Sequence, residues 1–296
     1  MNKLGKNGID KVLLGFIGPA LIFYLLFIVV PTIGSLYYSF TSWDGINPNI
    51  KFIGLDNYKE IFTSSRFGNA LKNTIVLTVF ISVFENAIAL ALALLVDRVI
   101  RFSNFFRSLF YIPVLISGIV SGFIWKVMYN YNFGVINALL DKIGLGMLKQ
   151  DWLGNTDLTL IMIGVVLVWK GAGYYMIIYL ASLQSISADV LEAAEIDGAT
   201  AWHKFTKITL PLISGAFTIN FTLSLINGLK VFDQINVMTD GGPGFTSETI
   251  VYLLYKVGFN EGRQGFGTAV GVVLLFIILI LNTAQQKFLR SREVQV

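Results

Sequence analysis

Long apolar runs alternate with short polar segments along the whole 296-residue chain. Each run is uncharged or nearly uncharged, and a helix needs about 20 such residues to cross the ~30 Å hydrocarbon core of a bilayer. The runs cover residues 12–40, 73–96, 108–125, 158–184, 212–232 and 264–286. The pattern predicts an all-α, polytopic membrane protein with six transmembrane helices in a single domain that spans residues 1–296.

Composition agrees with a membrane protein and narrows the chemistry. Hydrophobic residues make up 55% of the chain and charged residues 14%, against roughly 45–50% and about 25% in soluble domains. The first apolar run stays uncharged as far as Trp43 and has no small-residue cleavage pattern, so we expect a retained helix and not a signal peptide. The chain has no Cys and a single His, His203, which excludes disulfides, thiolate metal sites and His-rich metal clusters.

The positions of the Lys and Arg residues predict how the helices are oriented. If the N-terminus lies in the cytoplasm, the cytoplasmic segments hold eleven basic residues, whereas the outer loops are longer and hold eight together with ten acids. This bias favours both termini on the cytoplasmic side and indicates topology, not nucleic-acid binding. The cytoplasmic set is Lys3, Lys6, Lys11, Arg98, Arg101, Arg107, Lys204, Lys207, Lys287, Arg290 and Arg292.

Two common functional patterns are missing from the sequence. It contains neither the phosphate-binding pattern G-x-x-x-x-G-K-[ST] nor the nucleophile pattern G-x-S-x-G. We therefore expect a chain that is not an enzyme and that binds no ATP or other cofactor by itself.

A polar segment, EAAEIDGATAWHKFTKITLP at residues 192–211, separates two of the apolar runs. Ser187 as an N-cap, Asp189 in the first turn and Gly198 as a left-handed stop predict a short helix over 188–197. A second, amphipathic helix should follow and end at Pro211. Residues 187–211 would then form a compact helix–turn–helix knob on the cytoplasmic side, which either docks with a partner or rests on the membrane surface.

Polar residues also occur in the middle of the predicted spans. Glu85 and Lys170 lie at similar depth, where ionisable groups are costly and have either paired or functional roles. They could form a buried ion pair, face a water-filled path, or in the case of Lys170 meet an acidic substrate. Gly171 and Gly173 should weaken the helix around Lys170. Asn220, Ser224 and Asn227 share one helical face, for substrate contact or for hydrogen bonds between helices.

Several motifs together resemble a known family. Glu192-Ala193-Ala194, Gly198 and the later Ile208-Thr209-Leu210-Pro211 match the signature loop of the inner-membrane permease subunits of bacterial ATP-binding-cassette importers. The flanking motifs FIGLDNY, FRSLFYIPVLISGIVSGFIW, LQSIS and FDQINVMTDGGPGFTSET are similar to those of the carbohydrate-uptake branch, in particular its larger, maltose-type permease. The resemblance covers about residues 10–290. The chain lacks the large outer domain and two N-terminal spans of the maltose permease, so contacts of those parts do not transfer.

The resemblance implies partners and a coupling site. The loop 187–211 would dock into a cleft of an ATPase subunit, with coupling residues Glu192, Ala193, Ala194, Asp197 and Gly198. The expected partners are a second, homologous permease, two ATP-binding-cassette subunits that hold ATP and Mg, an external sugar-binding protein and the lipid of the cell membrane.

The resemblance also implies a substrate. Gly171, Tyr174, Ser224 and Asn227 align with sugar-contacting positions of the maltose-type permease. Lys170, where that permease is apolar, suggests an acidic sugar or oligosaccharide. Together with Glu85 and Asn220, these residues form the expected substrate path. The alternatives are import of another small polar solute such as glycerol phosphate, an ion-coupled secondary transporter that uses Glu85 and Lys170, and a membrane scaffold that transports nothing.

Overall fold

The computed structural model describes residues 6–98 and 102–293, and the regular elements in these ranges are helices. Across these described ranges, the single β-type pairing is an isolated antiparallel bridge between Thr41 and Phe52. The prediction of an all-α fold is therefore confirmed. Lys3 and Arg101, which contribute to the predicted charge bias, lie outside the described residues. The chain divides into two compact units, residues 1–63 with 254–274, and residues 64–253 with 275–296.

The membrane-spanning helices agree in part with the six predicted runs. Within the described residues, four helices are long and apolar enough to cross a bilayer: Gly15–Tyr38, Ser65–Asp97, Thr159–Gln184 and Gln264–Arg290. Two further candidates are bent pairs of helices, so the count reaches six if each pair is one span. The first of the four is built from α1 (Lys6–Tyr24), a π-helical turn (Leu25–Val29) and α2 (Val30–Tyr38).

The first unit contains α1, α2 and a folded loop that follows them. In this loop α3 (Asp56–Thr63) is held by Asn57, whose Nδ2 donates to the carbonyls of Ser39 and Thr41 at 2.8 and 2.9 Å. The unit also includes a π-helical turn (Lys256–Asn260) and the beginning of α15 (Gln264–Arg290). Gly265 N donates to Trp43 O at 2.8 Å, which ties the start of α15 to the loop.

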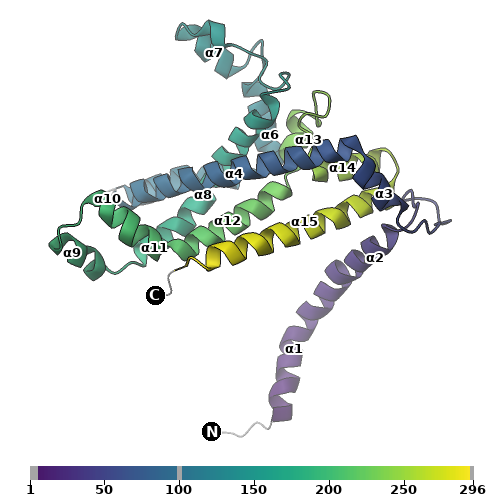
Figure 1. Cartoon of the computed structure of the whole chain (residues 1–296), viewed down its shortest axis with the longest axis horizontal. Coiled ribbons are helices and arrows are strands. Elements are labelled where there is room, and N and C mark those ends of the chain that lie inside the picture. Colours follow the sequence, from purple (N-terminus) through teal and green to yellow (C-terminus); the bar gives the residue numbers. More distant parts are fainter. Residues whose placement is uncertain (1–5, 99–101, 294–296) are drawn as a thin grey trace. The chain divides into compact units, whose positions relative to one another are not determined.

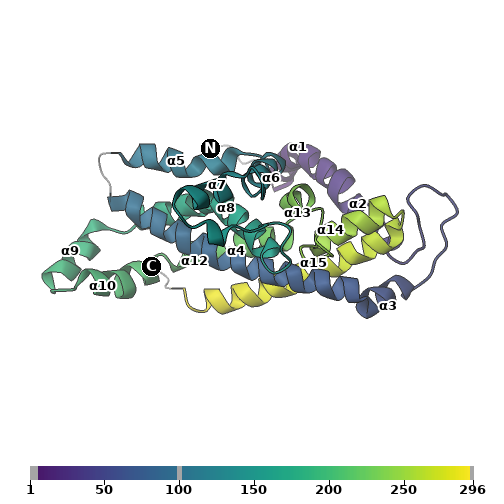
Figure 2. The ribbon, with the colours of Figure 1, turned by 90° about the horizontal axis from the view of Figure 1, so that it is seen from above.

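The second unit is centred on three helices: α4 (Ser65–Arg98), α8 (Thr159–Gln184) and α12 (Ser214–Leu229). Helix α4 packs along α8 and α12, and α5 (Ser103–Leu115) packs on α8. Short helices lie at the two ends of this group. Helices α9 (Ala188–Ile196) and α10 (Ala201–Lys204) lie at one end and α13 (Asp233–Met238) towards the other (Figures 1 and 2).

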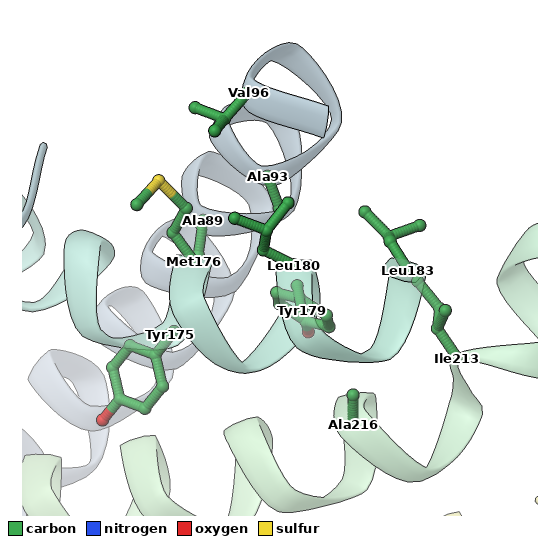
Figure 3. Packing of buried hydrophobic residues seen from close by; sticks show 10 residues of the cluster. All are labelled: Ala89, Ala93, Val96, Tyr175, Met176, Tyr179, Leu180, Leu183, Ile213 and Ala216. Atoms are coloured by element: carbon green, nitrogen blue, oxygen red, sulfur yellow. The ribbon is translucent and has the colours of Figure 1, made fainter. Parts of the chain in front are cut away.

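Small side chains bring α4, α8 and α12 close together. Ala89 and Ala93 of α4 are fully buried and face α8, where Met176 and Tyr179 are also fully buried, and Ala216 of α12 completes the contact (Figure 3). In lipid the hydrophobic effect does not drive helix association, so close packing through small residues takes its place. A polar contact is buried in the same core, because Tyr179 Oη donates to Asn86 Oδ1 at 2.8 Å.

The predicted span 108–125 is wrong as a single helix. The segment forms α5 and α6 (Gly118–Met128), which meet at 94°. Pro113 lies in the last turn of α5, and Ile116 has an extended backbone with φ −74° and ψ 132°. Ser117 then caps α6, and its Oγ accepts from Val120 N at 3.3 Å. Proline and a serine N-cap together explain why the chain stops one helix and begins another here.

The boundaries of two other predicted spans also change. Helix α4 begins at Ser65 instead of residue 73 and has 34 residues, which gives a length of about 50 Å, more than a bilayer core needs.

The predicted end of a helix at Pro211 is wrong as well. A π-helical turn (Phe205–Thr209) leads into α11 (Leu210–Leu212), and the bend of 66° follows at Ile213, before α12. The wide π-turn makes room for the proline ring, which clashes in a regular helix.

Candidate translocation cavity and coupling loop

Glu85 lies near the middle of α4 and is only 5% exposed. One carboxylate oxygen, Oε2, accepts a hydrogen bond from Ser224 Oγ of α12 at 2.7 Å, and that hydroxyl also lies 3.3 Å from Ser82 Oγ. A carboxylate in a membrane needs such donors, because an unsatisfied buried charge is costly. Glu85 therefore joins α4 to α12 at this depth.

Gly171 of α8 makes room for the same carboxylate. A Cβ atom at residue 171 would lie 2.0 Å from Glu85 Oε1, and one at Gly173 would lie 2.1 Å from the carbonyl oxygen of Phe110 in α5. That these glycines weaken the helix stays a prediction, but they do not interrupt it, because α8 runs unbroken from Thr159 to Gln184. The glycines instead allow neighbouring groups to approach α8 closely.

A cavity of about 420 Å³ opens beside this contact. Five of the predicted path residues line it together: Glu85, Lys170, Gly171, Tyr174 and Asn227. The cavity combines charged groups, amide groups and aromatic rings, which are the groups that bind hydroxyl-rich ligands. Asn227 Nδ2 donates to Tyr175 Oη at 3.2 Å, so the amide is oriented by its neighbour in α8.

Lys170 is not paired with Glu85. Within the described residues, no ion pair or hydrogen bond of the Lys170 side chain is present, although both side chains line the cavity. The interpretation of these two residues as a buried ion pair is therefore not supported by the contacts. The Lys170 ammonium is half-buried and remains available to a ligand in the cavity.

Two of the predicted path residues lie outside the cavity. Asn220 and Ser224 are both fully buried. Asn220 Nδ2 donates to the backbone carbonyl of Tyr175 at 3.0 Å, and Ser224 donates to Glu85. Both side chains form hydrogen bonds between helices, the alternative that their spacing left open.

Three charged or amide-bearing lining residues were not identified from the sequence: Lys230, Asp233 and Gln234. They lie where α12 ends and α13 begins, at the border of the predicted fifth span. The charges of Lys230 and Asp233 at the end of this apolar run are the signal that could have revealed them. The Asp233 carboxylate lies against Gly118, where a Cβ would be 2.1 Å from Oδ2. Gln234 Nε2 donates to Ser121 Oγ of α6 at 3.3 Å.

In the predicted coupling loop, residues 187–211, the first helix and the glycine turn fold as predicted. Helix α9 begins at Ala188, Ser187 Oγ accepts from Asp189 N at 3.3 Å, and Gly198 has a φ of +76°. Thr200 then caps α10 by accepting from His203 N at 3.2 Å. An ion pair between Lys204 and Glu195 closes the two helices on each other and lowers the pKa of Glu195.

The surface of this loop has the features of a docking site. Glu192, Ala193, Asp197 and Gly198 are exposed, whereas Ala194 is buried. Ile196 and Trp202 are 87% and 73% exposed, unusual for large apolar side chains on a polar segment. A hollow of about 380 Å³ lies between the two helices, lined by Ala194, Asp197, Gly198 and His203 among others. Exposed apolar groups beside charged ones are typical of protein interaction sites.

The fold and the cavity define a polytopic helical membrane protein of the transporter class. The chain belongs to the family described as binding-protein-dependent transport system inner membrane component, whose model matches residues 86–293. The chain therefore belongs to a family of transport permeases, as the sequence motifs predicted.

Similar proteins share nearly the full length of the chain. A "probable starch degradation products transport system permease protein" of Thermoanaerobacterium thermosulfurigenes is 36% identical, over 99% of this chain and 98% of its own. An sn-glycerol-3-phosphate transport system permease protein of Escherichia coli is 30% identical, over 93% of both chains. A chain of a bacterial ABC transporter involved in the import of the acidic polysaccharide alginate has a TM-score of 0.84 and 27% identity, over 95% of this chain and 96% of its own.

Proposed function

We propose that this chain is the permease subunit of an ATP-driven, binding-protein-dependent importer for a sugar or oligosaccharide. The observation that carries the proposal is the polar cavity at mid-depth of the candidate spans, where Lys170, Tyr174 and Asn227 meet. The names of the similar starch-product and alginate transport proteins support a carbohydrate substrate. The exposed loop 187–211 supplies the second requirement of such an importer, a place for an ATPase to act.

The proposed assembly has six spans in this chain and both termini in the cytoplasm of a bacterial or archaeal cell. A second permease would complete the translocation path, two ATPase subunits would bind ATP and Mg, and an external binding protein would deliver the substrate. A related alginate transporter has been crystallised in complex with a periplasmic protein bound to an alginate pentasaccharide, which supports this last partner. Closure of the ATPases on Glu192, Ala193, Ala194, Asp197 and Gly198 would drive the permeases towards the outward-facing state.

The cavity suggests how substrate is held. Asn227 and Tyr174 can bond to hydroxyl groups, and Glu85 can accept from them through its remaining lone pairs. Lys170 and Lys230 can bind a carboxylate or a phosphate by charge-assisted hydrogen bonds. An acidic sugar is therefore a candidate substrate, and glycerol phosphate is the second candidate, supported by the similarity to a glycerol-3-phosphate permease.

Co-purification followed by an uptake assay tests the proposal. The tagged chain is solubilised gently, and its partners are identified by mass spectrometry. An ATPase with a phosphate-binding loop, a second permease and ATP-dependent, vanadate-sensitive uptake of a sugar by the reconstituted complex are expected. A chain that purifies alone, with uptake that follows an ion gradient, would instead favour the ion-coupled transporter, with Glu85 and Lys170 as its coupling charges.

A further inference from the structure

The break between α12 and α13 leaves backbone carbonyls without helical partners, as every helix end does. At this break the carbonyl oxygen of Val231 accepts a hydrogen bond from Thr249 Oγ1 at 3.0 Å. Thr249 is 1% exposed and Val231 is 8% exposed. The bond therefore connects the rim of the cavity, residues 230–234, with a loop segment that is distant along the chain.

The segment that carries Thr249 is fixed to the outer turns of α4. Ile250 N donates to Thr74 Oγ1 at 2.9 Å, and Asn73 Nδ2 donates to the carbonyl of Glu248 at 3.1 Å. Asn69 Nδ2 donates to Phe245 O at 2.7 Å. Two consecutive turns of α4 thus hold residues 245–250.

A partly buried ion pair completes this attachment. Arg66 of α4 binds the Glu248 carboxylate through two bonds, Nε to Oε2 at 2.9 Å and Nη2 to Oε1 at 2.8 Å. Glu248 is only 1% exposed, and the Arg66 guanidinium also lies 4.8 Å from the centre of the Phe245 ring. A bidentate pair of this kind fixes geometry as well as charge.

The cavity rim is joined to this attachment through the backbone carbonyl of Val231. Within the described residues, no hydrogen bond or ion pair of the Lys230 or Asp233 side chain is present. Gln234 is the exception, because it is bonded to α6. The Asp233 carboxylate packs against Gly118 of α6, and Lys230 directly precedes Val231, whose carbonyl is bonded to Thr249. The backbone at residue 231 is held by Thr249, and Thr249 by α4.

We propose that Thr249 and the Arg66–Glu248 pair are positioning residues of the translocation cavity, which set where Lys230 and Asp233 lie. The inference rests on the proposed function only in taking the cavity as the substrate path. Three steps connect α4 to the rim of that path. Arg66 of α4 binds Glu248, Glu248 is followed directly by Thr249, and Thr249 donates to the carbonyl of Val231.

Site-specific thiol labelling in the intact complex tests the proposal. Since the chain has no Cys, Lys230→Cys provides a single reporter at the rim, and Lys170→Cys a second on the unbroken helix α8. Thr249→Val removes the hydroxyl at nearly constant shape, and Thr249→Ser keeps it.

In the Thr249→Val background we expect the labelling rate at residue 230 to change by about fivefold, as expected for one lost hydrogen bond. The rate at residue 170 should stay constant, and Thr249→Ser should match the parent at both positions.

A second pair of variants keeps the test valid if Thr249→Val lowers the yield. Arg66→Lys keeps the charge but loses the bidentate geometry, and should also change labelling at residue 230. Glu60→Gln is the matched control, because Glu60 forms a bidentate pair with Arg263 in which both side chains are nearly half exposed, and such surface pairs contribute little.

Equal changes at both reporters, or no change at residue 230, would overturn the positioning role. Labelling needs no sugar, so its result is separate from the uptake assay: absence of sugar uptake would contradict the proposed function while leaving the positioning result intact.

Discussion

The coupling loop and the translocation cavity are built in opposite ways. In the loop, residues 187–211, each structural feature depends on a neighbour a few positions away: Ser187 on Asp189, Thr200 on His203 and Glu195 on Lys204. In the cavity, the important contacts join residues that are far apart, such as Glu85 with Ser224 and Thr249 with Val231.

This difference explains which changes each region tolerates. A local motif keeps its shape when the surrounding bundle shifts, which suits the coupling role proposed for this loop. A cavity lined by several packed helices loses its shape if one helix moves. Substitutions at the packed contacts between these helices should therefore affect folding and assembly, whereas substitutions at the exposed surface of the loop should affect transport.

The largest effect is expected for Gly173→Val, which tests the close approach of α5 to α8. A Cβ at residue 173 would lie 2.1 Å from the Phe110 carbonyl oxygen and 3.2 Å from Tyr111 Cα, which are backbone atoms that cannot rotate away. We expect destabilisation of about 3 kcal/mol or more, at the upper end of overpacking costs. Fluorescence-detected size-exclusion chromatography of the tagged chain should show a strong loss of monodisperse protein.

Gly68→Ala is the matched control for this substitution. Gly68 lies in α4, and no atom lies within 4 Å of a Cβ placed there. Alanine favours a helix over glycine by about 0.5–1 kcal/mol, so the variant should be as stable as the parent or more so. A normal elution profile for Gly173→Val would contradict the role given to the close approach.

The next largest effect is expected for Glu192→Lys and Gly198→Pro, which test the coupling loop. Glu192 is exposed on α9, and Gly198 has a φ of +76° that proline cannot adopt. We expect membrane insertion and yield to stay normal while ATP-dependent uptake is abolished. Asp157→Lys is the control, since it makes the same charge reversal at an exposed residue outside the loop. Uptake at the parental rate in either loop variant would argue against a coupling role.

A smaller and more selective effect is expected for Lys170→Met, which tests whether the cavity binds acidic substrates. Lys170 lines the cavity without a protein partner among the described side chains. Hydrogen bonds to charged groups contribute about 1.5–3 kcal/mol, so uptake of an acidic sugar should fall roughly tenfold or more, and uptake of a neutral sugar should not. Lys230→Met should act in the same direction. Unchanged uptake of the acidic substrate by a correctly assembled Lys170→Met complex would exclude this substrate class.

The contrast between local and distant contacts also decides how much could be predicted from the sequence. Ser187 and Gly198 are local signals for a helix start and stop, and the sequence predicted α9 to within one residue. Lys170 and Asn227 were identified because polar groups in apolar runs are rare, but Asn220 follows the same rule and is buried between helices instead. Lys230 and Asp233 were missed, because they lie at the break between α12 and α13, and periodicity does not show which neighbouring helix a break brings its residues to.

The smallest effect concerns the ion pair within the loop. Lys204 holds the pKa of Glu195 below its usual value, so the pair stabilises the closed loop at pH values above the unfolded pKa of about 4.3. That contribution is lost as the pH falls through the lowered pKa in the folded state. Amide hydrogen exchange of α9 and α10 can be compared between the parent and Glu195→Gln at each pH from about 6 down to 3. At pH 6 the variant should exchange faster than the parent. The two rates should converge at the acidic end, and a difference that persists there would mean that Glu195 acts through packing and not through its charge.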